Sequence, residues 1–250
     1  MRCAEPVAVV TGGTGGIGTA ICEALAAGGF AVVVGYGKSR EAAERLAVSL
    51  PGTGHMALSI PVTDSEGLRT MAGIVQQRYE RCDALVNCAG TTRFVAHSDL
   101  DALDDRLIDD ILATNVRGCF ASLRALLSLL KTSTRPGGGV VVNISSIAAR
   151  TANGSNVMYC ASKAAVDNMT QSLARALAPA VRVVSVSPGL VDTEFVKSLD
   201  QRWRDEQATR TPLGRLASTG DVATAVLTVI RDLTFTTGTI VAVDGGRPLQ

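Results

Sequence analysis

A tyrosine and a lysine stand four residues apart, at Tyr159 and Lys163, in the stretch Tyr-Cys-Ala-Ser-Lys. On a helix, this spacing places both side chains on the same face. A free tyrosine has a pKa of about 10, which is too high for efficient proton exchange near neutrality. A neighbouring ammonium group favours the phenolate, so such a pair can exchange a proton with a substrate. Taken alone, the pair is more typical of an exposed helix surface, and its meaning depends on the rest of the chain.

Residues 7–18 read as an apolar run followed by Thr-Gly-Gly-Thr-Gly-Gly-Ile-Gly. Between a strand and a helix, glycines let the backbone approach a pyrophosphate, and the helix N-terminus offers free N–H groups. Glycine-rich turns also serve merely to reverse a chain, so the prediction of a dinucleotide-binding loop depends on the position at the first such junction. Two assignments are open: G-x-G-x-x-G at Gly13, Gly15 and Gly18, or T-G-x-x-x-G-x-G at Gly12, Gly16 and Gly18.

The end of the second apolar run indicates which dinucleotide would bind. A carboxylate there would accept a hydrogen bond from the ribose 2′-hydroxyl and repel a 2′-phosphate. The chain has no acid between residues 34 and 40, and Lys38, Ser39 and Arg40 could pair with a 2′-phosphate. A compatible interpretation is an exposed helix start with Ser39 as its N-cap. We therefore favour NADP(H) over NAD(H).

Short runs rich in Val, Ile or Leu alternate with helical patterns along the whole chain. The predicted strands are Val7–Thr11, Ala31–Gly35, His55–Ile60, Ala84–Asn87, Gly139–Ser145, Val181–Ser187 and Thr239–Val243. The predicted helices are Gly16–Ala27, Ser39–Ser49, Asp64–Glu80, Asp101–Lys131, Val157–Ala178 and Thr219–Arg231. This alternation predicts an α/β fold, a single Rossmann-type doubly wound parallel sheet of about seven strands with helices on both faces.

No linker or repeat divides the chain, so residues 1–250 are expected to form one domain. One irregular region, residues 188–218, follows the sixth predicted strand and contains Phe195, Trp203 and Pro212. Open α/β sheets bind ligands at the carboxyl ends of their strands. This region is therefore a candidate substrate lid.

The composition excludes several classes of function. The net charge of +1 indicates neither a nucleic-acid footprint nor a patch for a membrane surface. No apolar run reaches the roughly 20 residues of a membrane span, and the first residues lack the features of a signal peptide, so we expect a cytoplasmic protein. The six cysteines are scattered singly and are interpreted as small buried hydrophobes. His55 and His97 lack partners at ligand spacing, so they are interpreted as structural and no metal site is expected.

Several spaced motifs, which together cover nearly the entire chain, resemble those of the short-chain dehydrogenase/reductase family. Thr11–Gly18 resembles the family's T-G-x-x-x-G-x-G, which selects the second assignment of the glycines, and Asn87–Gly90 resembles its N-N-A-G. Ser146 lies thirteen residues before Tyr159, at the usual spacing of the family's catalytic serine, with Ser145 as an adjacent competitor. The motif residues that complete the resemblance are Asn115, in Thr-Asn-Val-Arg-Gly, and the P-G-x-x-x-T stretch Pro188–Thr193.

The resemblance implies a mechanism for these residues. Tyr159 would donate a proton to a carbonyl oxygen as hydride arrives from the nicotinamide, and Ser146 would hydrogen-bond that oxygen. Lys163 would bind the nicotinamide ribose and favour the phenolate of the tyrosine. Asn115 would hold a water that links the lysine to solvent.

The resemblance also implies which residues contact the cofactor. They are Gly12, Thr14, Gly16, Ile17, Gly18, Tyr36, Lys38, Ser39, Arg40, Val62, Asn87, Ala89, Gly90, Tyr159, Lys163, Pro188, Gly189, Val191 and Thr193. The chain departs from the family pattern at two positions. Pro61 stands where the family often has an acid that accepts from the adenine amine, so only backbone contacts are expected there. Cys88 replaces the second asparagine of N-N-A-G and is expected to be tolerated.

Residues 11–22 look most like those of 3-oxoacyl (acetoacetyl) thioester reductases, although this similarity concerns the cofactor. We expect reduction of a 3-oxoacyl thioester; the alternative is a small-ketone, diketone or sugar-type alcohol dehydrogenase. A protein that only senses NADPH would not need all four catalytic residues. The resemblance implies a homotetramer formed through the two long helices and the C-terminal strand. The residues expected to line the substrate cleft are Arg93, Phe94, Arg150, Asn153, Met158, Leu190, Phe195 and Trp203.

Overall fold

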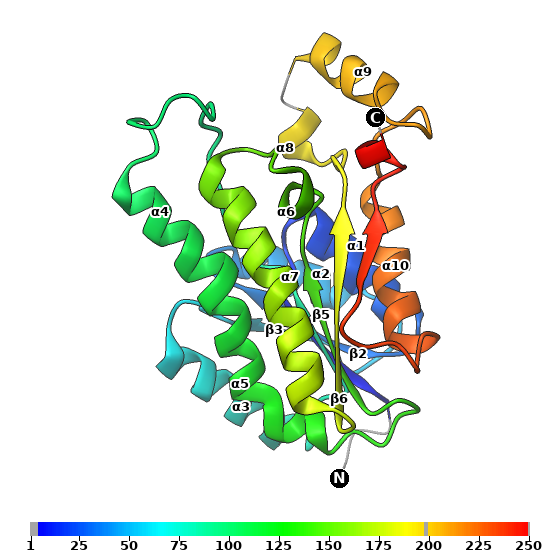
Figure 1. Ribbon diagram of the computed structural model, residues 1–250. Helices are drawn as coiled ribbons and strands as arrows, with labels where there is room; N and C mark the ends of the chain where they lie inside the picture. The colour runs from blue at the N-terminus through cyan, green and yellow to red at the C-terminus, as the bar shows by residue number, and fades with distance from the viewer. Residues whose placement is uncertain (1–4, 198–199, 250) are drawn as a thin grey trace.

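In the computed structural model, which describes residues 5–197 and 200–249, seven strands form one parallel sheet (Figure 1). Cys3 and the side chain of the predicted lid residue Phe195 lie outside the described residues. The strand order is β3-β2-β1-β4-β5-β6-β7, so the chain reverses its direction of winding between β1 and β4. This order confirms the predicted doubly wound fold. The strands are β1 (Val7–Thr11), β2 (Ala31–Tyr36), β3 (Met56–Ser59), β4 (Ala84–Asn87), β5 (Gly139–Ile144), β6 (Val181–Pro188) and β7 (Ile240–Val243).

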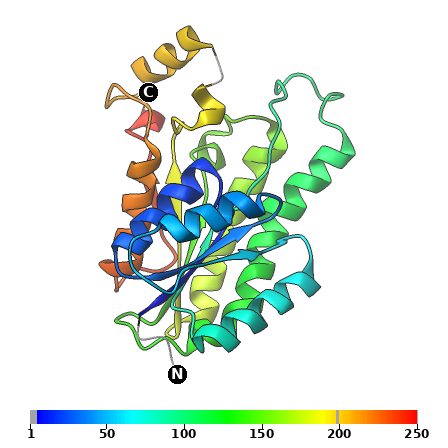
Figure 2. The same cartoon turned by 180° about the vertical axis from the view of Figure 1, so that it is seen from behind.

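Helices cover both faces of the sheet (Figures 1 and 2). On one face lie α3 (Ser65–Tyr79), α5 (Gly118–Lys131) and α7 (Val157–Leu177), and on the other lie α1 (Gly16–Ala27), α2 (Arg40–Ser49) and α10 (Thr219–Arg231). Alternating strand residues feed the two layers: Val9 and Val33 pack on the α3 side, and Val10 and Val34 pack on the α1 side. Burial on both faces explains why the strands are almost entirely apolar.

The predicted single helix Asp101–Lys131 is wrong in two respects. It begins only at Asp105, because the side chain of Asp104 caps it by accepting a hydrogen bond from the Leu107 N–H. It is also divided into α4 (Asp105–Ile111), a π-helical segment η1 (Leu112–Arg117) and α5. A π-helical turn inserts one residue into an otherwise regular helix and is frequent at functional sites.

The region predicted to be irregular, residues 188–218, contains two helices. They are α8 (Glu194–Lys197) and α9 (Gln201–Thr209), and α9 is capped by the side chain of Asp200. Sequence periodicity could not reveal α9, because the helix buries none of its residues and so has no apolar stripe. Two further short helices, α6 (Ala148–Thr151) and the 3₁₀ turn η2 (Arg247–Leu249), were not predicted either.

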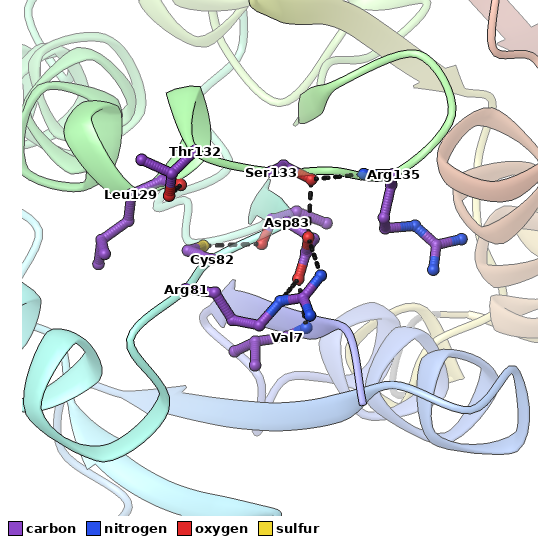
Figure 3. Close-up of polar contacts among 9 residues, drawn as sticks. Val7, Arg81, Cys82, Asp83, Leu129, Thr132, Ser133 and Arg135 are labelled. Carbon is purple, nitrogen blue, oxygen red and sulfur yellow. Dashed lines mark hydrogen bonds and ion pairs between the residues drawn. The ribbon is translucent and has the colours of Figure 1, made fainter. Parts of the chain in front are cut away.

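Asp83 ties several elements together at the edge of the sheet opposite to the strand carboxyl ends (Figure 3). The carboxylate is fully buried, accepts a 2.8 Å hydrogen bond from the Val7 N–H of β1 and a 2.7 Å bond from the Ser133 hydroxyl, and forms a bidentate pair with Arg81. Burial by itself would raise the pKa of Asp83. The hydrogen bonds from Arg81, Ser133 and Val7 outweigh burial and hold this pKa below its ordinary value.

Replacing Asp83 by asparagine should lower the free energy of unfolding by about 1–3 kcal/mol, because charged hydrogen bonds to a buried group are lost. The pKa of Asp83 is lowered in the folded protein, so its stabilisation is complete above the unfolded value of about 3.9 and is lost as the pH falls through the folded value. Chemical unfolding of both proteins at several pH values should therefore show a constant difference near neutrality that shrinks in acid.

Asp232→Asn is the matched control, because Asp232 pairs with Arg231 at the surface, where both side chains are about half exposed. This variant should leave the unfolding midpoint unchanged. A midpoint in Asp83→Asn that also equals the wild-type value would contradict the role given to Asp83.

Candidate active site

A glycine-rich turn joins β1 to α1 at the carboxyl edge of the sheet. Gly12 adopts a left-handed φ of 65°, and a Cβ there would lie 2.8 Å from the Ala89 Cα. A Cβ on Gly18 would overlap the carbonyl oxygen of Gly12. Within this turn, the backbone therefore requires glycine most strictly at Gly12 and Gly18. Both are glycines of the T-G-x-x-x-G-x-G assignment.

The N-terminus of α1 is open. Gly15 occupies the N-cap position and has no side chain to bond the N–H groups of the first turn, and both Gly15 and Gly16 are exposed. An N-terminus of this kind, reached through a turn without side chains, fits a pyrophosphate. Thr14 and Ile17 are half-buried in the same turn, and a Cβ on Gly16 would lie 3.4 Å from the Thr193 side chain. The predicted stretch Pro188–Thr193 thus reaches the glycine-rich turn.

Thr11, to which the sequence analysis gave no role of its own, joins two parts of the site. Its hydroxyl oxygen accepts hydrogen bonds from the backbone N–H groups of Cys88 and Ala89, both at 3.1 Å. The last residue of β1 therefore holds the stretch after β4 against the glycine-rich turn. A polar residue ending an otherwise apolar strand was the signal that pointed to it.

The side chain of Asn87 turns into the protein. It is 3% exposed, and its Nδ2 donates to Asn143 Oδ1, at 2.9 Å, in the register-paired position of β5. Asn143 in turn donates to Thr170 on α7, at 2.8 Å, and Thr170 also hydrogen-bonds Ser185 on β6. Of the predicted cofactor residues in this stretch, Ala89 is half-buried and Gly90 is exposed.

Tyr159 and Lys163 occupy the first two turns of α7, on one side of the helix. Lys163 is 8% exposed, and its Nζ lies 5.7 Å from the centre of the tyrosine ring and donates to the Ile144 carbonyl at 2.7 Å. Tyr159 is half-buried. The structure thus places the two side chains together, as their spacing predicted.

Asn115 lies buried in η1, and its side chain is fully engaged. Oδ1 accepts from the Thr91 N–H at 2.8 Å, and Nδ2 donates to the Thr91 carbonyl and to Ser162 Oγ, both at 3.1 Å. A water that links Asn115 to Lys163 would therefore meet the backbone carbonyl of Asn115. That carbonyl also accepts from Cys119 Sγ at 3.0 Å.

The two adjacent serines after β5 have different surroundings. Ser145 is 3% exposed, its backbone N–H donates to the Val186 carbonyl, and its hydroxyl lies 3.5 Å from the Lys163 carbonyl. Ser146 is half-buried, and its Oγ accepts from the Ala148 N–H at 3.2 Å. Of the two hydroxyls, that of Ser146 is therefore the more accessible.

The residues predicted to select the dinucleotide lie at the exposed end of β2. Tyr36 is half-buried, and Lys38, Ser39 and Arg40 are exposed. Ser39 stands at the N-cap position of α2, as predicted, but its side chain makes no cap hydrogen bond. Arg40 bonds Glu44 at 2.8 Å, which raises the pKa of the Arg40 guanidinium.

The departure at Pro61 has a packing reason. Its ring packs against the position of Gly67, where a Cβ would overlap it. The next acid, Asp64, caps α3 by accepting from the Glu66 N–H at 2.9 Å. Val62, a predicted cofactor contact, is half-buried and lies against Gly118.

The cations expected to line the substrate cleft already have partners. Arg93 bonds Asp104 at 3.2 Å, and Arg150 bonds Asp244 at 3.2 Å. Met158 and Leu190 are half-buried, whereas Phe94, Asn153 and Trp203 are exposed.

The helix α9, in the candidate lid, is fastened from two sides. Arg204 bonds Asp192 at 2.7 Å, and Arg247 of the C-terminal turn donates to the backbone and side chain of Gln207 at 2.7 and 2.6 Å. In Figure 1, α9 lies at the end of the molecule that also holds α8 and the C-terminal turn.

Burial disfavours the thiolate form of the two thiols near Lys163. Burial raises the pKa of Cys88 to about 12 and that of Cys119 to about 11, against the opposing effect of the Lys163 charge. Within the described residues, the cysteines are free and no cluster of His, Cys, Asp or Glu could hold a metal. His55 and His97 contact backbone groups, including Val32 N–H and the Gly154 carbonyl. No helix in the described part of the chain has the length and apolar character to cross a membrane.

Gly18→Ala should weaken binding of a nicotinamide dinucleotide at this turn and destabilise the fold by about 1–3 kcal/mol, because the new methyl group overlaps the Gly12 carbonyl. Gly73→Ala is the matched control. Gly73 lies exposed in α3, away from the glycine-rich turn, and a Cβ there would meet nothing within 4 Å. Nucleotide titration by fluorescence, combined with thermal unfolding, measures both effects. Equal nucleotide affinity in the two variants would contradict this geometry.

Comparisons with known proteins agree with this geometry. A family model described as enoyl-(acyl carrier protein) reductase matches residues 12–247. The chain is 38% identical over 246 residues to a ketoacyl reductase of the granaticin polyketide synthase of Streptomyces violaceoruber, covering 98% of this chain and 96% of that protein. It is 36% identical over 248 residues to the cis-4-hydroxycyclohexanecarboxylate dehydrogenase of Sinomonas cyclohexanicum, covering 97% and 96% of the two chains.

A solved structure of a short-chain dehydrogenase/reductase from Burkholderia xenovorans superimposes with a TM-score of 0.90 at 31% identity, covering 100% of both chains. The match of fold and sequence extends over the glycine-rich turn, the Tyr159–Lys163 helix and the C-terminal turn alike. The chain therefore belongs to the short-chain dehydrogenase/reductase family and is an oxidoreductase that acts on carbonyl or hydroxyl groups.

Proposed function

We propose that the protein is an NADPH-dependent carbonyl reductase in which Tyr159 is the general acid. The observation that carries this proposal is the placement of Tyr159 beside a buried Lys163, whose Nζ lies 5.7 Å from the tyrosine ring. Because Lys163 is nearly buried, its Nζ is poorly screened by solvent where it lies beside the tyrosine ring. Family membership supports the same assignment.

The residues around the glycine-rich turn would hold the cofactor. The open N-terminus of α1 and the side-chain-free surface at Gly15 and Gly16 suit its pyrophosphate. Thr193 lies beside this turn, and Gly90 lies beside Asn115 and Lys163. When bound, NADPH supplies the hydride, and the protein supplies position and charge.

The chain's own residues would manage the proton and the developing charge. Tyr159 donates a proton to the substrate oxygen, and Ser146, the more accessible serine, donates a hydrogen bond to the same oxygen. Lys163 stabilises the resulting phenolate and binds the ribose. The backbone carbonyl of Asn115 holds the water through which the proton is replaced, because the side chain of Asn115 is already engaged.

The end of β2 supports NADPH over NADH. The segment from Tyr36 to Arg40 presents a lysine, a serine and an arginine and no carboxylate. The Ser39 hydroxyl makes no cap bond and so stays available to a 2′-phosphate. A 2′-phosphate would compete with Glu44 for the Arg40 guanidinium, with which it can form charge-assisted hydrogen bonds.

We propose a 3-oxoacyl thioester as the substrate. The similarity to a polyketide ketoacyl reductase supports this proposal. The second candidate is an alcohol dehydrogenase that acts on a small cyclic or open-chain ketone, and the similarity to a hydroxycyclohexanecarboxylate dehydrogenase favours it. In both cases residues 188–218 form the lid of a single-domain enzyme. A panel of 3-oxoacyl thioesters, diketones and keto sugars decides between the two candidates. Reduction of each compound by NADPH is measured as the loss of reduced-nicotinamide absorbance.

We also propose a homotetramer. A mostly apolar groove over α4, η1, α5 and α7 supports assembly through these helices; its lining is Asp109, Leu112, Ala113, Val116, Arg117, Phe120 and Met169. β7 supports assembly through the C-terminal region, because it forms an edge of the sheet. A monomer mass in light scattering at micromolar concentration would contradict the tetramer.

Tyr159→Phe should lower kcat by about 10²–10⁴-fold, because the variant loses its general acid, and should leave NADPH binding intact. Steady-state kinetics and fluorescence titration measure the two effects. Tyr79→Phe is the matched control, because its hydroxyl donates to the Gly54 carbonyl far from the site, and it should keep wild-type kcat. Substantial turnover by Tyr159→Phe would overturn the assignment.

The wild-type enzyme should have a higher kcat/KM with NADPH than with NADH. Ser39→Asp should lower this ratio by about tenfold or more, because a carboxylate repels the 2′-phosphate and accepts from a 2′-hydroxyl. Ser49→Asp places the same charge at the other end of α2 and should leave the ratio unchanged. A clear preference of the wild-type enzyme for NADH would refute the cofactor assignment.

A further inference from the structure

Asn156 is a buried junction between two walls of the candidate active site. It precedes the first residue of α7 and is only 1% exposed. Its Oδ1 accepts one hydrogen bond, and its Nδ2 makes two contacts as a donor, so both polar atoms of the side chain are engaged. Neither the motif spacing nor the family resemblance assigned it a role.

The first contact holds the backbone of Tyr159. The Tyr159 N–H donates to Asn156 Oδ1 at 2.7 Å. On the other side of the same residue, Ser162 Oγ donates to the Tyr159 carbonyl at 2.7 Å and accepts from Asn115 Nδ2 at 3.1 Å. Tyr159 is therefore held at both its N–H and its C=O by side chains that are themselves buried.

The other contacts hold the segment that follows the predicted cofactor stretch. Asn156 Nδ2 donates to Thr92 Oγ1 at 3.1 Å and to the Arg93 carbonyl at 2.8 Å. Two neighbouring contacts strengthen this attachment: Thr92 Oγ1 lies 2.5 Å from Ser155 Oγ, and the Val95 N–H donates to the Ser155 carbonyl at 2.8 Å. Residues 91–95, hereafter the wall segment, are thus attached to the start of α7.

An N-cap alone does not require this arrangement. Capping needs only an acceptor, which serine, threonine or aspartate supplies. The described helices that have a side-chain cap elsewhere use exposed residues, namely Asp64, Asp104, Asp200 and Ser218. The buried amide of Asn156 adds two donor contacts, and donors buried without acceptors would be costly. The two donor contacts of Asn156 therefore hold the wall segment and are not needed to cap α7.

We propose that Asn156 is a positioning residue that fixes Tyr159 relative to the wall segment. The Oδ1 atom sets where α7 begins and so where the Tyr159 side chain stands. The Nδ2 atom sets how far the wall segment lies from that side chain. The inference rests on the proposed role of Tyr159 as general acid, because its kinetic consequence requires the tyrosine to meet the substrate oxygen.

Three variants separate the two functions of the side chain. Asn156→Ala removes the cap and the donors, whereas Asn156→Ser keeps an acceptor for the Tyr159 N–H but has no amide donors. Thr92→Val removes one acceptor of Nδ2 and leaves Asn156 itself in place. Asp64→Ala, which removes the N-cap of α3, is the control for loss of a cap as such.

We expect Asn156→Ala to lower kcat by roughly 10- to 100-fold, because small displacements of a reacting group reduce rates by such factors. Asn156→Ser should recover the thermal midpoint but keep a lowered kcat and a raised KM for the carbonyl substrate. Thr92→Val should change kcat and this KM in the same directions as Asn156→Ser, but by smaller factors. The KM for NADPH should change little in any of them, because the glycine-rich turn is untouched. Asp64→Ala should lose stability without losing kcat.

Hydrogen exchange gives a readout that does not need turnover. In Asn156→Ser, amides of the wall segment, including the Val95 N–H that bonds the Ser155 carbonyl, should exchange faster than in the wild type, and in Asp64→Ala they should not. Wild-type kinetics and unchanged exchange in Asn156→Ser would overturn the proposal, even if Asn156→Ala fails to fold. If the wild type reduces no carbonyl compound, the proposed function fails, while the exchange data still decide whether Asn156 holds the wall segment.

Discussion

Asn143 lies on the inner strand β5 and forms one hydrogen bond to the neighbouring strand β4 and one to helix α7. It accepts from Asn87 on β4 and donates to Thr170 on α7, which also bonds Ser185 on β6. Nearer its start, α7 is also held by Lys163, which donates to the Ile144 carbonyl, and by Ser162, which accepts from Asn115. Because these bonds are directional and buried, together they fix the axial position of α7 on the sheet. The positions of Tyr159 and Lys163, which lie on the same helix, depend on them.

At the carboxyl edge of the sheet, burial determines how well solvent screens the Lys163 side chain. Lys163 is nearly buried, and its described hydrogen bond goes to a neutral carbonyl, that of Ile144. The Nζ group of Lys163 therefore lies in a poorly screened environment, 5.7 Å from the centre of the Tyr159 ring. Burial in the same region raises the pKa of the thiols of Cys88 and Cys119.

Much of the fold could be predicted from the sequence, because buried parallel strands are apolar and caps, prolines and glycines separate them from helices. The proximity of Tyr159 and Lys163 was predictable too, since helical spacing alone dictates it. The polar helix α9 was not, because it buries no residue and has no periodic signal. The π-helical turn η1 was missed because it interrupts an apolar pattern that continues smoothly on both sides.

Motif spacing also could not reveal where a side chain points. Asn87 and Asn115 were predicted from the motifs as site residues, yet both direct their amides into the protein, where they connect backbone segments. Thr11 bonds Cys88 and Ala89, and Asn156 bonds Thr92 and Arg93, in both cases more than 60 residues away, so the sequence does not show which segments these side chains connect. The sites of catalysis and cofactor binding that the motifs predict stay predictions, whereas the structure shows the scaffold that would position them.

The C-terminal turn bears on how the protein is handled. Arg247 bonds Gln207 of α9, and the Gly245 carbonyl accepts from Leu213, so the last residues brace the candidate lid. An affinity tag attached next to this turn would adjoin these contacts, and removal of residues 244–249 would abolish them. Recombinant enzyme intended for kinetics should therefore carry its tag at the other end of the chain, where the first strand begins at the opposite edge of the sheet (Figure 1).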